Sequence, residues 1–390
     1  MSLASAQGLY IHVPFCHQRC HFCAFYLEIH QARAAEDFVA TLLEEVRLYG
    51  KSDWIEPAPL DSIYFGGGTP TTLSPTQLAT ILATSRDIFG LAPDAEVTIE
   101  AHPDSVIQAS LTLLREAGFT RLSLGAESMD QTELSRVGRP GSPVTTSRTM
   151  DAARAAGFTN INLDLMYGLP GQTLESWAAS LRRTVELAPA HLSCYALTVE
   201  DNTHLKTSIQ RGLLPAPDED LQNRMEDRAE EILSREGYHR YEISNYCRPG
   251  FASRHNRLHW TGGRYLGVGP SAQSYVGGRR FGNVSDLTAY TAALQNGRLP
   301  VSEFNQLTQA DESCERLIFG LRLIDGISLK ETGVLSFPDI TQAVNHLVTE
   351  DLIECEGELV RLTTSGRRYA DTVAVSLLAS VQSRDTPVCH

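Results

Sequence analysis

The stretch YIHVPFCHQRCHFCAFY, residues 10–26, decides the fold of this protein. It begins as a short apolar strand and continues at once into three cysteines, Cys16, Cys20 and Cys23, with the spacing C-x3-C-x2-C. Thiolates this close together bind soft metals or iron–sulfur clusters. Three ligands suit a [4Fe–4S] cluster in which the protein holds three irons. The fourth iron then stays open for a small molecule, so the spacing predicts a site of chemistry.

A structural zinc site is the alternative interpretation of the same cysteines. Structural zinc normally takes four protein ligands, and no second Cys/His pair is spaced to complete the set. His17 and His21 lie within the stretch, so a Cys3His zinc site stays open. The other cysteines are scattered singly, which is typical of small buried apolar residues in a reducing compartment.

The composition of the 390 residues is that of a globular protein, with 42% hydrophobic and 21% charged residues. No apolar run approaches the roughly 20 residues that a membrane span needs. The first residues lack the basic and apolar regions of a secretory signal, so we expect a cytoplasmic protein. The formal net charge of −14 disfavours a nucleic-acid-binding protein, which would carry a basic surface.

Short apolar runs alternate with helical patterns through the first half of the chain. The runs that we expect to be strands are residues 9–14, 62–68, 97–102, 121–128, 160–168 and 191–199. Six repeats of this alternation predict an α/β fold with a parallel sheet. Six units are too few to close an eight-stranded barrel, so we expect a six-stranded partial (β/α) barrel. Polar residues at the carboxyl ends of its strands should line the site, as they do in full barrels.

The second half of the chain has a different pattern, and we divide the whole into three parts. Residues 1–210 should form the partial barrel, residues 211–304 an extension, and residues 305–390 a C-terminal domain. The extension contains a segment, residues 238–275, that reads as a loop rich in aromatic residues and histidines. The C-terminal pattern of helices and a hairpin is winged-helix-like. With 13 acidic and 7 basic residues, this domain is expected to be a lid or a docking domain that binds no nucleic acid.

The cysteine spacing at the end of a first barrel strand resembles the signature of the radical S-adenosylmethionine (SAM) superfamily, whose fold is a six-stranded partial barrel. Further segments resemble one subgroup, which contains the oxygen-independent coproporphyrinogen III dehydrogenases and the HemW heme chaperones. These segments, in order, are YIHVPFC, FGGGTPTTL, RLSLGAES, DLMYGLPGQT, YEISNYCRPG and RHNRLHW. The resemblance implies that Cys16, Cys20 and Cys23 hold a [4Fe–4S] cluster and that SAM binds at the open iron.

The resemblance also implies which residues contact SAM. Tyr10 and Phe22 match SAM-contacting positions, and Phe22 is equally suited to plain packing. Arg139 matches an arginine that pairs with the SAM carboxylate, and Asp164 would accept a hydrogen bond near the adenosine. Further cofactor contacts are expected from Gly67, Gly68, Thr69, Glu100 and Glu127. No residue is expected to be catalytic.

Three of these positions carry a qualification that comes from the residue type. Glu127 stands where the subgroup usually has glutamine, and an ionised glutamate only accepts hydrogen bonds, whereas glutamine also donates. Glu127 is therefore suited to a partner that donates. The glycines allow a ligand to approach the backbone closely, but Gly67 and Gly68 could equally form a tight turn after their strand.

Two features favour a heme chaperone over a coproporphyrinogen III dehydrogenase. The dehydrogenases carry a further cysteine two residues after the third, where this chain has Phe25, and a longer segment precedes the tyrosine that Tyr10 matches. The RHNRLHW segment resembles a stretch of HemW proteins, with His259 where tyrosine is typical. His255 is the candidate heme ligand, with Cys247 and His259 as secondary candidates, and His255 could instead pin its loop by hydrogen bonding.

The resemblance implies a protein that binds heme and hands it to acceptor proteins, among them respiratory enzymes at the membrane face. It also implies a homodimer linked to the cluster. The alternative function is that of a radical SAM oxidoreductase acting on coproporphyrinogen III or a related porphyrinogen. A zinc-dependent regulator with a winged helix is a third interpretation, which the charge of the C-terminal domain disfavours.

Overall fold

Strands and helices alternate along a computed structural model that describes residues 7–55, 58–337 and 339–381. The strands are β1 (Gly8–Val13), β2 (Phe15–Cys16), β3 (Glu28–Ile29), β4 (Leu60–Gly67), β5 (Leu91–Ala101), β6 (Arg121–Glu127), β7 (Asn160–Tyr167), β8 (His191–Ala196), β9 (His239–Glu242), β10 (Asn245–Cys247), β11 (Tyr265–Val268), β12 (Gln273–Val276), β13 (Arg279–Asn283), β14 (Val301–Gln306), β15 (Ile327–Ser328), β16 (Ile353–Glu356) and β17 (Leu359–Leu362). The α-helices are α1 (Ala32–Lys51), α2 (Pro75–Phe89), α3 (Gln108–Ala117), α4 (Gln131–Arg136), α5 (Pro143–Ala155), α6 (Leu174–Glu186), α7 (His204–Gln210), α8 (Glu219–Arg235), α9 (Arg254–Trp260), α10 (Leu287–Gln295), α11 (Gln309–Gly320), α12 (Leu329–Thr332), α13 (Ile340–Thr349), α14 (Thr364–Arg368) and α15 (Ala370–Val381).

The central feature is a large, mostly parallel sheet. In the described part of the chain its strand order is β14-β13-β12-β11-β1-β4-β5-β6-β7-β8-β10-β9. The pairing is parallel from β11 through β8, so the predicted α/β fold and all the strands predicted in the first half are confirmed. The strand β11 was not predicted, and it extends the parallel part by pairing with β1. Its four residues are too short for a clear alternation of apolar and polar residues.

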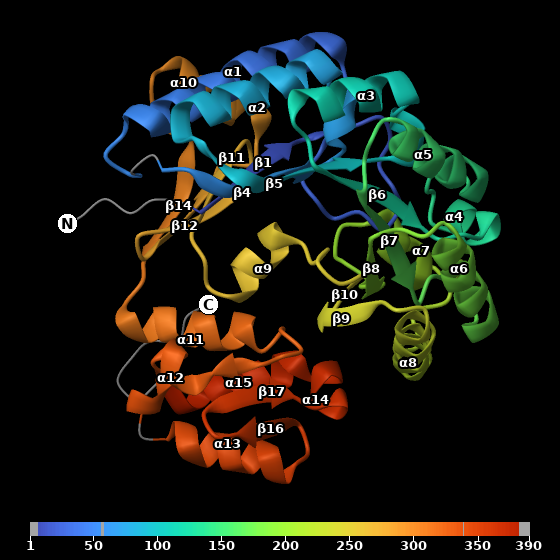
Figure 1. Ribbon diagram of the computed structural model, residues 1–390, viewed down its shortest axis with the longest axis vertical. Coiled ribbons are helices and arrows are strands. Elements are labelled where there is room, and N and C mark those ends of the chain that lie inside the picture. The colour runs from blue at the N-terminus through green and yellow to red at the C-terminus, as the bar shows by residue number, and fades with distance from the viewer. Residues whose placement is uncertain (1–6, 56–57, 338, 382–390) are drawn as a thin grey trace.

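The helices that follow the strands cover the outer face of the sheet, as α1, α2, α3 and α5 do along the upper edge of Figure 1. Local signals in the sequence begin them. Ser74 accepts a hydrogen bond from the N–H of Gln77, whose side chain accepts one from the N–H of Ser74, and Pro75 opens α2. Thr173 caps α6 in the same way. No helix in the described residues combines the length and the apolar character needed to cross a membrane.

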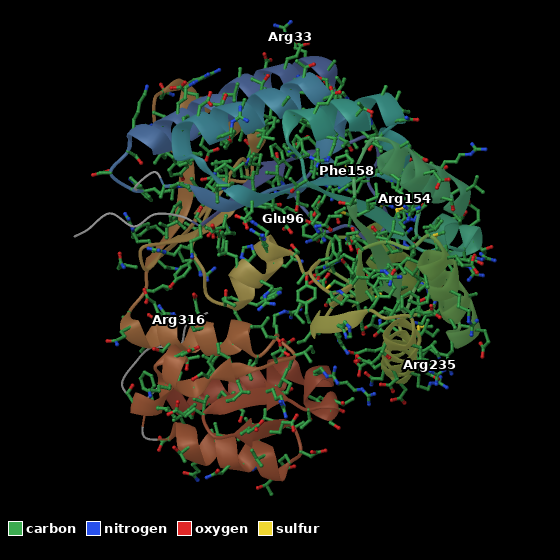
Figure 2. All side chains as sticks on the ribbon, viewed as in Figure 1. Arg33, Glu96, Arg154, Phe158, Arg235 and Arg316 are labelled. Carbon is green, nitrogen blue, oxygen red and sulfur yellow. The ribbon has the colours of Figure 1, made fainter. Side chains whose placement is uncertain are left out.

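The short helix α9 lies on the inner side of the sheet and not among the outer helices (Figure 1). Glu96 of β5, labelled in Figure 2, holds its N-terminus: the carboxylate accepts hydrogen bonds from Ser253 Oγ at 3.0 Å and from the N–H of Arg254 at 3.2 Å. A negative group is favourable at this end of a helix. The expectation that residues 238–275 form a loop is therefore wrong: they form β9–β12 and α9, because most of their backbone groups pair with the sheet or within the helix.

The chain from α11 onward packs around a hydrophobic core of its own, below the main sheet in Figure 1. This core joins α11, α13 and α15 with the small antiparallel sheet β15-β17-β16. The main core, by contrast, runs from Leu9 to Val301 and includes residues on both sides of position 210. The three-part division of the chain and the winged-helix-like character of residues 305–390 remain predictions.

Candidate functional site

The three cysteines lie in the segment that follows β1. The Sγ of Cys16 is 3.4 Å from the hydroxyl of Thr69, and the N–H of Cys23 donates to the carbonyl oxygen of Cys20 at 3.2 Å. Burial raises the pKa of Cys16 and of Cys23, and neighbouring thiols of the set raise both further. Among the described residues, no three His, Cys, Asp or Glu side chains converge on the position of a single metal ion.

Arg139 links the cysteine segment to the end of β6. Its Nη1 donates to Cys20 Sγ at 3.4 Å, and its Nη2 donates to the carbonyl oxygen of Gly125 at 2.6 Å. The same guanidinium lies 3.5 Å from a carboxylate oxygen of Glu127. The predicted pairing of Arg139 with the SAM carboxylate stays a prediction, because most of the guanidinium already has protein partners.

Gly67, which ends β4, and Gly68 fit closely against the cysteine segment. Gly67 has a φ of +108°, and a Cβ there would lie 2.8 Å from the ring of His12. A Cβ at Gly68 would lie 2.6 Å from the carbonyl oxygen of Phe15. The N–H groups of Gly68 and Thr69 donate to Val13 and Phe15 carbonyls, at 2.8 and 2.7 Å. Both N–H groups are therefore paired within the protein and do not remain free to donate to a ligand.

Glu100 ends β5 among buried aromatic residues. It accepts a hydrogen bond from the hydroxyl of Tyr64 at 2.6 Å, and the ring of Tyr64 stacks on that of Tyr10 with centroids 6.2 Å apart. The hydroxyl of Tyr10 lies 3.2 Å from Nδ1 of His12. Burial raises the pKa of Glu100 to about 7, although the hydrogen bond from Tyr64 opposes the shift. This carboxyl group therefore titrates near neutral pH.

Glu127 occupies a strained position at a β-bulge. The register between β6 and β7 shifts at Gly125 and Glu127, and Glu127 has a φ of +62°, which is uncommon for a residue other than glycine. Its carboxylate accepts from the Tyr195 hydroxyl at 2.6 Å and faces Arg139. Both partners donate, so an acceptor-only side chain suits this position in place of glutamine.

Asp164 of β7 completes a group of three buried carboxylates. It accepts hydrogen bonds from Asn162 Nδ2 at 2.7 Å and from Ser123 Oγ at 3.2 Å. Burial raises the pKa of Glu100, Glu127 and Asp164, and for Glu100 and Glu127 the repulsion by neighbouring carboxylates adds to it. The strands β5, β6 and β7 thus bring together residues that are far apart in sequence. A concentration of negative charge favours a ligand that carries positive charge.

Phe22 and His255 occupy buried surroundings. Phe22 is partly buried and packs against an apolar cluster that includes Val137 and Leu169, and its contact with SAM stays a prediction. His255 on α9 is only 2% exposed, its Nδ1 lies 2.9 Å from Ser62 Oγ, and its ring stacks on that of Tyr64 with centroids 5.1 Å apart. These contacts pin α9 to β4. A role for His255 as heme ligand stays a prediction, and its Nε2 is buried without a hydrogen-bond partner among the described residues.

The sequence interpretation missed four polar side chains that surround these carboxylates: Tyr64, Tyr195, Arg121 and His191. Arg121 is 1% exposed, and its positive charge acts on Asp164. His191 lies 2.6 Å from Asn162, which itself binds Asp164. The sequence could have indicated Tyr64, because side chains alternate along a strand and Tyr64, two residues before Gly66, faces the same side of β4. No local signal distinguishes the others from ordinary strand residues.

Comparisons with known proteins agree with this geometry. Residues 10–184 match the model of the radical SAM superfamily. The chain is 36% identical to the heme chaperone HemW of Mycobacterium tuberculosis strain CDC 1551, over 95% of this chain and 94% of that protein. It is 33% identical to the heme chaperone HemW of Bacillus subtilis, over 96% of this chain and all of that protein.

A solved structure shares the fold. The coproporphyrinogen III oxidase HemN of Escherichia coli, described as a radical SAM enzyme, superposes with a TM-score of 0.84 over 96% of this chain and 90% of that one. The identity is 24%, so this likeness concerns the fold alone. The identity to the heme chaperones, together with the cysteine segment and the partial barrel that carries it, shows the family. The chain belongs to the HemW heme chaperone family of radical SAM proteins.

Proposed function

We propose that this protein holds a [4Fe–4S] cluster and SAM, binds heme, and transfers the heme to acceptor proteins. The observation that carries the proposal is the identity of 36% to a heme chaperone over 95% of the chain. The cysteine segment supports it, because Cys16 Sγ lies 3.4 Å from the Thr69 hydroxyl and Cys20 Sγ lies 3.4 Å from Arg139 Nη1. At the position of a further cysteine the chain has Phe25, which is 69% exposed. Acceptors among respiratory enzymes at the membrane face, a cytoplasmic location and a homodimer belong to the same proposal and rest on the family resemblance.

The residues around the thiols fit a cluster with one open iron. Cys16, Cys20 and Cys23 would hold three irons, and Arg139 would stabilise the sulfur of Cys20. When bound, the cluster supplies an iron that the amino and carboxylate groups of SAM can chelate. The Thr69 hydroxyl, 3.4 Å from Cys16 Sγ, would then be an acceptor for the amino group.

The buried carboxylates fit the positive charge of SAM. SAM carries a sulfonium and an ammonium group. Glu127 and Asp164 lie close enough to Glu100 to raise its pKa, and Arg139 links Glu127 to Cys20. The ribose hydroxyls of SAM donate hydrogen bonds, which an ionised Glu100 can accept. Tyr195 and Arg139 keep Glu127 in place.

We expect SAM affinity to rise with pH through the titration of Glu100. Burial raises the pKa of Glu100 to about 7, so the carboxylate that accepts from SAM becomes populated as the pH passes that value. In Tyr64→Phe the midpoint should move to higher pH, because the lost hydrogen bond is one that lowers this pKa. SAM titrations of the reconstituted protein between about pH 6 and 8.5 measure this midpoint. The control is Tyr238→Phe, which removes a hydroxyl bonded to the carbonyl of Pro189; equal midpoints in both variants would contradict the role of Glu100.

We also expect stable heme binding without coproporphyrinogen III decarboxylation. Phe25 supplies no thiol where the dehydrogenases have a further cysteine. After anaerobic reconstitution, addition of protein should shift the Soret band of heme and give a saturable titration. The parallel assay with coproporphyrinogen III and SAM should yield no protoporphyrinogen IX. Robust conversion without stable heme binding would overturn the chaperone proposal in favour of a radical SAM oxidoreductase.

A further inference from the structure

Buried polar side chains form a continuous series of hydrogen bonds across β9, β8 and β7. The hydroxyl of Tyr241 lies 2.9 Å from Nε2 of His191, and Nδ1 of His191 lies 2.6 Å from Oδ1 of Asn162. Asn162 Nδ2 in turn donates to Asp164 Oδ1 at 2.7 Å. His191 and Asn162 are buried, so no exchange with bulk water replaces these bonds. A buried polar network is stable only when each member is satisfied, and this requirement sets the direction of every bond.

The side-chain amide of Asn162 has a fixed orientation. Its Nδ2 donates to Asp164 and, at 2.7 Å, to Ser123 Oγ. Its Oδ1 accepts from Ser193 Oγ at 3.3 Å and faces His191. An ionised carboxylate only accepts hydrogen bonds. If the amide turned over, its oxygen would face the oxygen of Asp164, so Nδ2 points to Asp164 and Oδ1 to His191.

This orientation decides which nitrogen of His191 carries the proton. Burial holds the pKa of His191 well below its ordinary range, so the imidazole is neutral and has one N–H. Because Asn162 Oδ1 only accepts, the proton is on Nδ1. Nε2 then keeps a lone pair, to which the hydroxyl of Tyr241 donates. The Tyr241 oxygen accepts at 3.4 Å from the N–H of Ser253, the residue that caps α9, so every donor in the series points toward Asp164.

We infer that His191 is a positioning residue for Asp164: through the amide of Asn162, it keeps an N–H donor against the carboxylate, which remains an acceptor for a ligand hydroxyl or amino group. This inference rests on the proposed function, in which the ligand is SAM. It adds to the site a residue of β8 that acts through its neighbour.

Asp164 needs this support because it is buried. Burial raises the pKa of Asp164, which favours the protonated carboxyl group, and the hydrogen bonds from Asn162 and Ser123 oppose that shift. A protonated carboxyl group has one oxygen occupied by its own proton and accepts less well from a ligand donor. Through Asn162, His191 therefore affects both the orientation and the charge of Asp164.

Two variants of nearly the same shape test the role of His191. In His191→Asn an amide N–H replaces the Nδ1 donor, whereas His191→Leu has a similarly branched side chain that forms no hydrogen bonds. In the reconstituted protein, His191→Leu should weaken SAM binding at least about tenfold, as expected when a hydrogen bond to a charged group is lost. His191→Asn should stay within about threefold of the unaltered protein. Equal weakening in both variants would indicate a merely structural role and overturn the inference.

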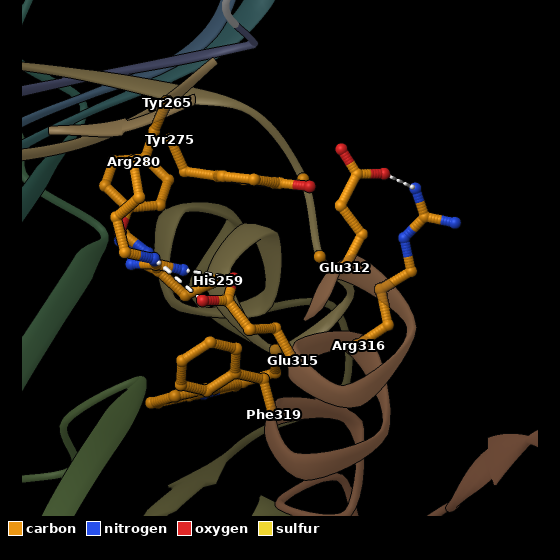
Figure 3. Close-up of a pocket in the computed structure, with 11 residues that line it drawn as sticks. His259, Tyr265, Tyr275, Arg280, Glu312, Glu315, Arg316 and Phe319 are labelled. Atoms are coloured by element: carbon orange, nitrogen blue, oxygen red, sulfur yellow. Dashed lines mark hydrogen bonds and ion pairs between the residues drawn. The ribbon is translucent and has the colours of Figure 1, made fainter. Parts of the chain in front are cut away.

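Imidazole nitrogen NMR of isotope-labelled protein tests the direction of the series without any ligand. The signals that disappear in His191→Asn should show a protonated Nδ1 and an unprotonated Nε2. In Tyr241→Phe the Nε2 signal should move, because its donor is lost. The matched control is Tyr265→Phe, since both tyrosines are 9% exposed. Figure 3 shows Tyr265 beside Arg280, which donates to its hydroxyl at 3.3 Å, in a pocket next to α11.

Three results would contradict these proposals in different ways. A proton on Nε2 of His191 would overturn the inference, as would equal shifts of the Nε2 signal in Tyr241→Phe and Tyr265→Phe. Failure of the unaltered protein to bind SAM would instead overturn the proposed function. The NMR spectrum does not depend on SAM, so the two failures are distinguishable.

Discussion

Cys16→Ser is expected to abolish assembly of the iron–sulfur cluster. Anaerobic reconstitution of the unaltered protein should give about four irons per chain and a cluster EPR signal that SAM perturbs. Serine oxygen is a poor replacement for a thiolate toward iron, and with only Cys20 and Cys23 left the cluster would be held at two irons. The iron content should therefore fall close to zero. Iron analysis and EPR measure the result.

The control for this experiment is Cys355→Ser. Cys355 lies exposed on β16, in the C-terminal part of the chain, and should not affect the iron content. Uptake of one zinc ion with no iron by the unaltered protein would contradict the cluster and support the Cys3His zinc alternative. Equal iron in both variants would also contradict the assignment of Cys16.

Glu45→Ala is expected to cause a large loss of stability. Glu45 on α1 is fully buried and accepts hydrogen bonds from the N–H of Gly269 at 2.8 Å, from Asn283 Nδ2 at 2.6 Å and from the hydroxyl of Tyr290. Each donor left without an acceptor costs about 1–3 kcal/mol, so the free energy of unfolding should fall by at least about 3 kcal/mol. Chemical denaturation measures this change.

The neighbouring residue provides a matched control. Glu44→Ala makes the same substitution one position earlier on α1, where the half-exposed carboxylate pairs only loosely with Arg47 at 3.6 Å. Its effect should stay within about 0.5 kcal/mol. Similar losses in both variants would show that the network around Glu45 does not hold α1 to the strands and α10.

The pH dependence gives a second measure of the same carboxyl group. Burial raises the pKa of Glu45 from its ordinary 4.5 to about 7, so the folded state keeps a proton that the unfolded state releases in this range. The contribution of Glu45 to stability is therefore largest below pH 4.5 and is lost as the pH rises toward 7. This part of the pH dependence should disappear in Glu45→Ala.

The sequence by itself determined the features that depend on local spacing. The alternation of strands and helices predicted the parallel sheet, and residues such as Ser74 and Thr173 marked where helices begin. The shared site that the cysteine spacing predicts after β1 stays a prediction. The carboxyl ends of the strands predicted that Glu100 and Asp164 would lie close together, and Asp164 does raise the pKa of Glu100. The confirmed inferences succeed because a strand or cap pattern is a property of neighbouring residues, and parallel strands align their carboxyl ends by geometry alone.

Only the tertiary structure decided which side chains pair across the fold. The contact of Arg139 with Cys20 joins residues 119 positions apart, and the contact of His255 with Ser62 joins residues 193 apart. The placement of β11 beside β1 and of α9 on the inner side of the sheet likewise depends on packing between distant segments. A local pattern carries no information on such pairs, because many arrangements of the same helices and strands satisfy it equally. The burial and hydrogen bonding of the whole chain select one of these arrangements. The hydrogen bonds between Glu96 and the start of α9 are an example.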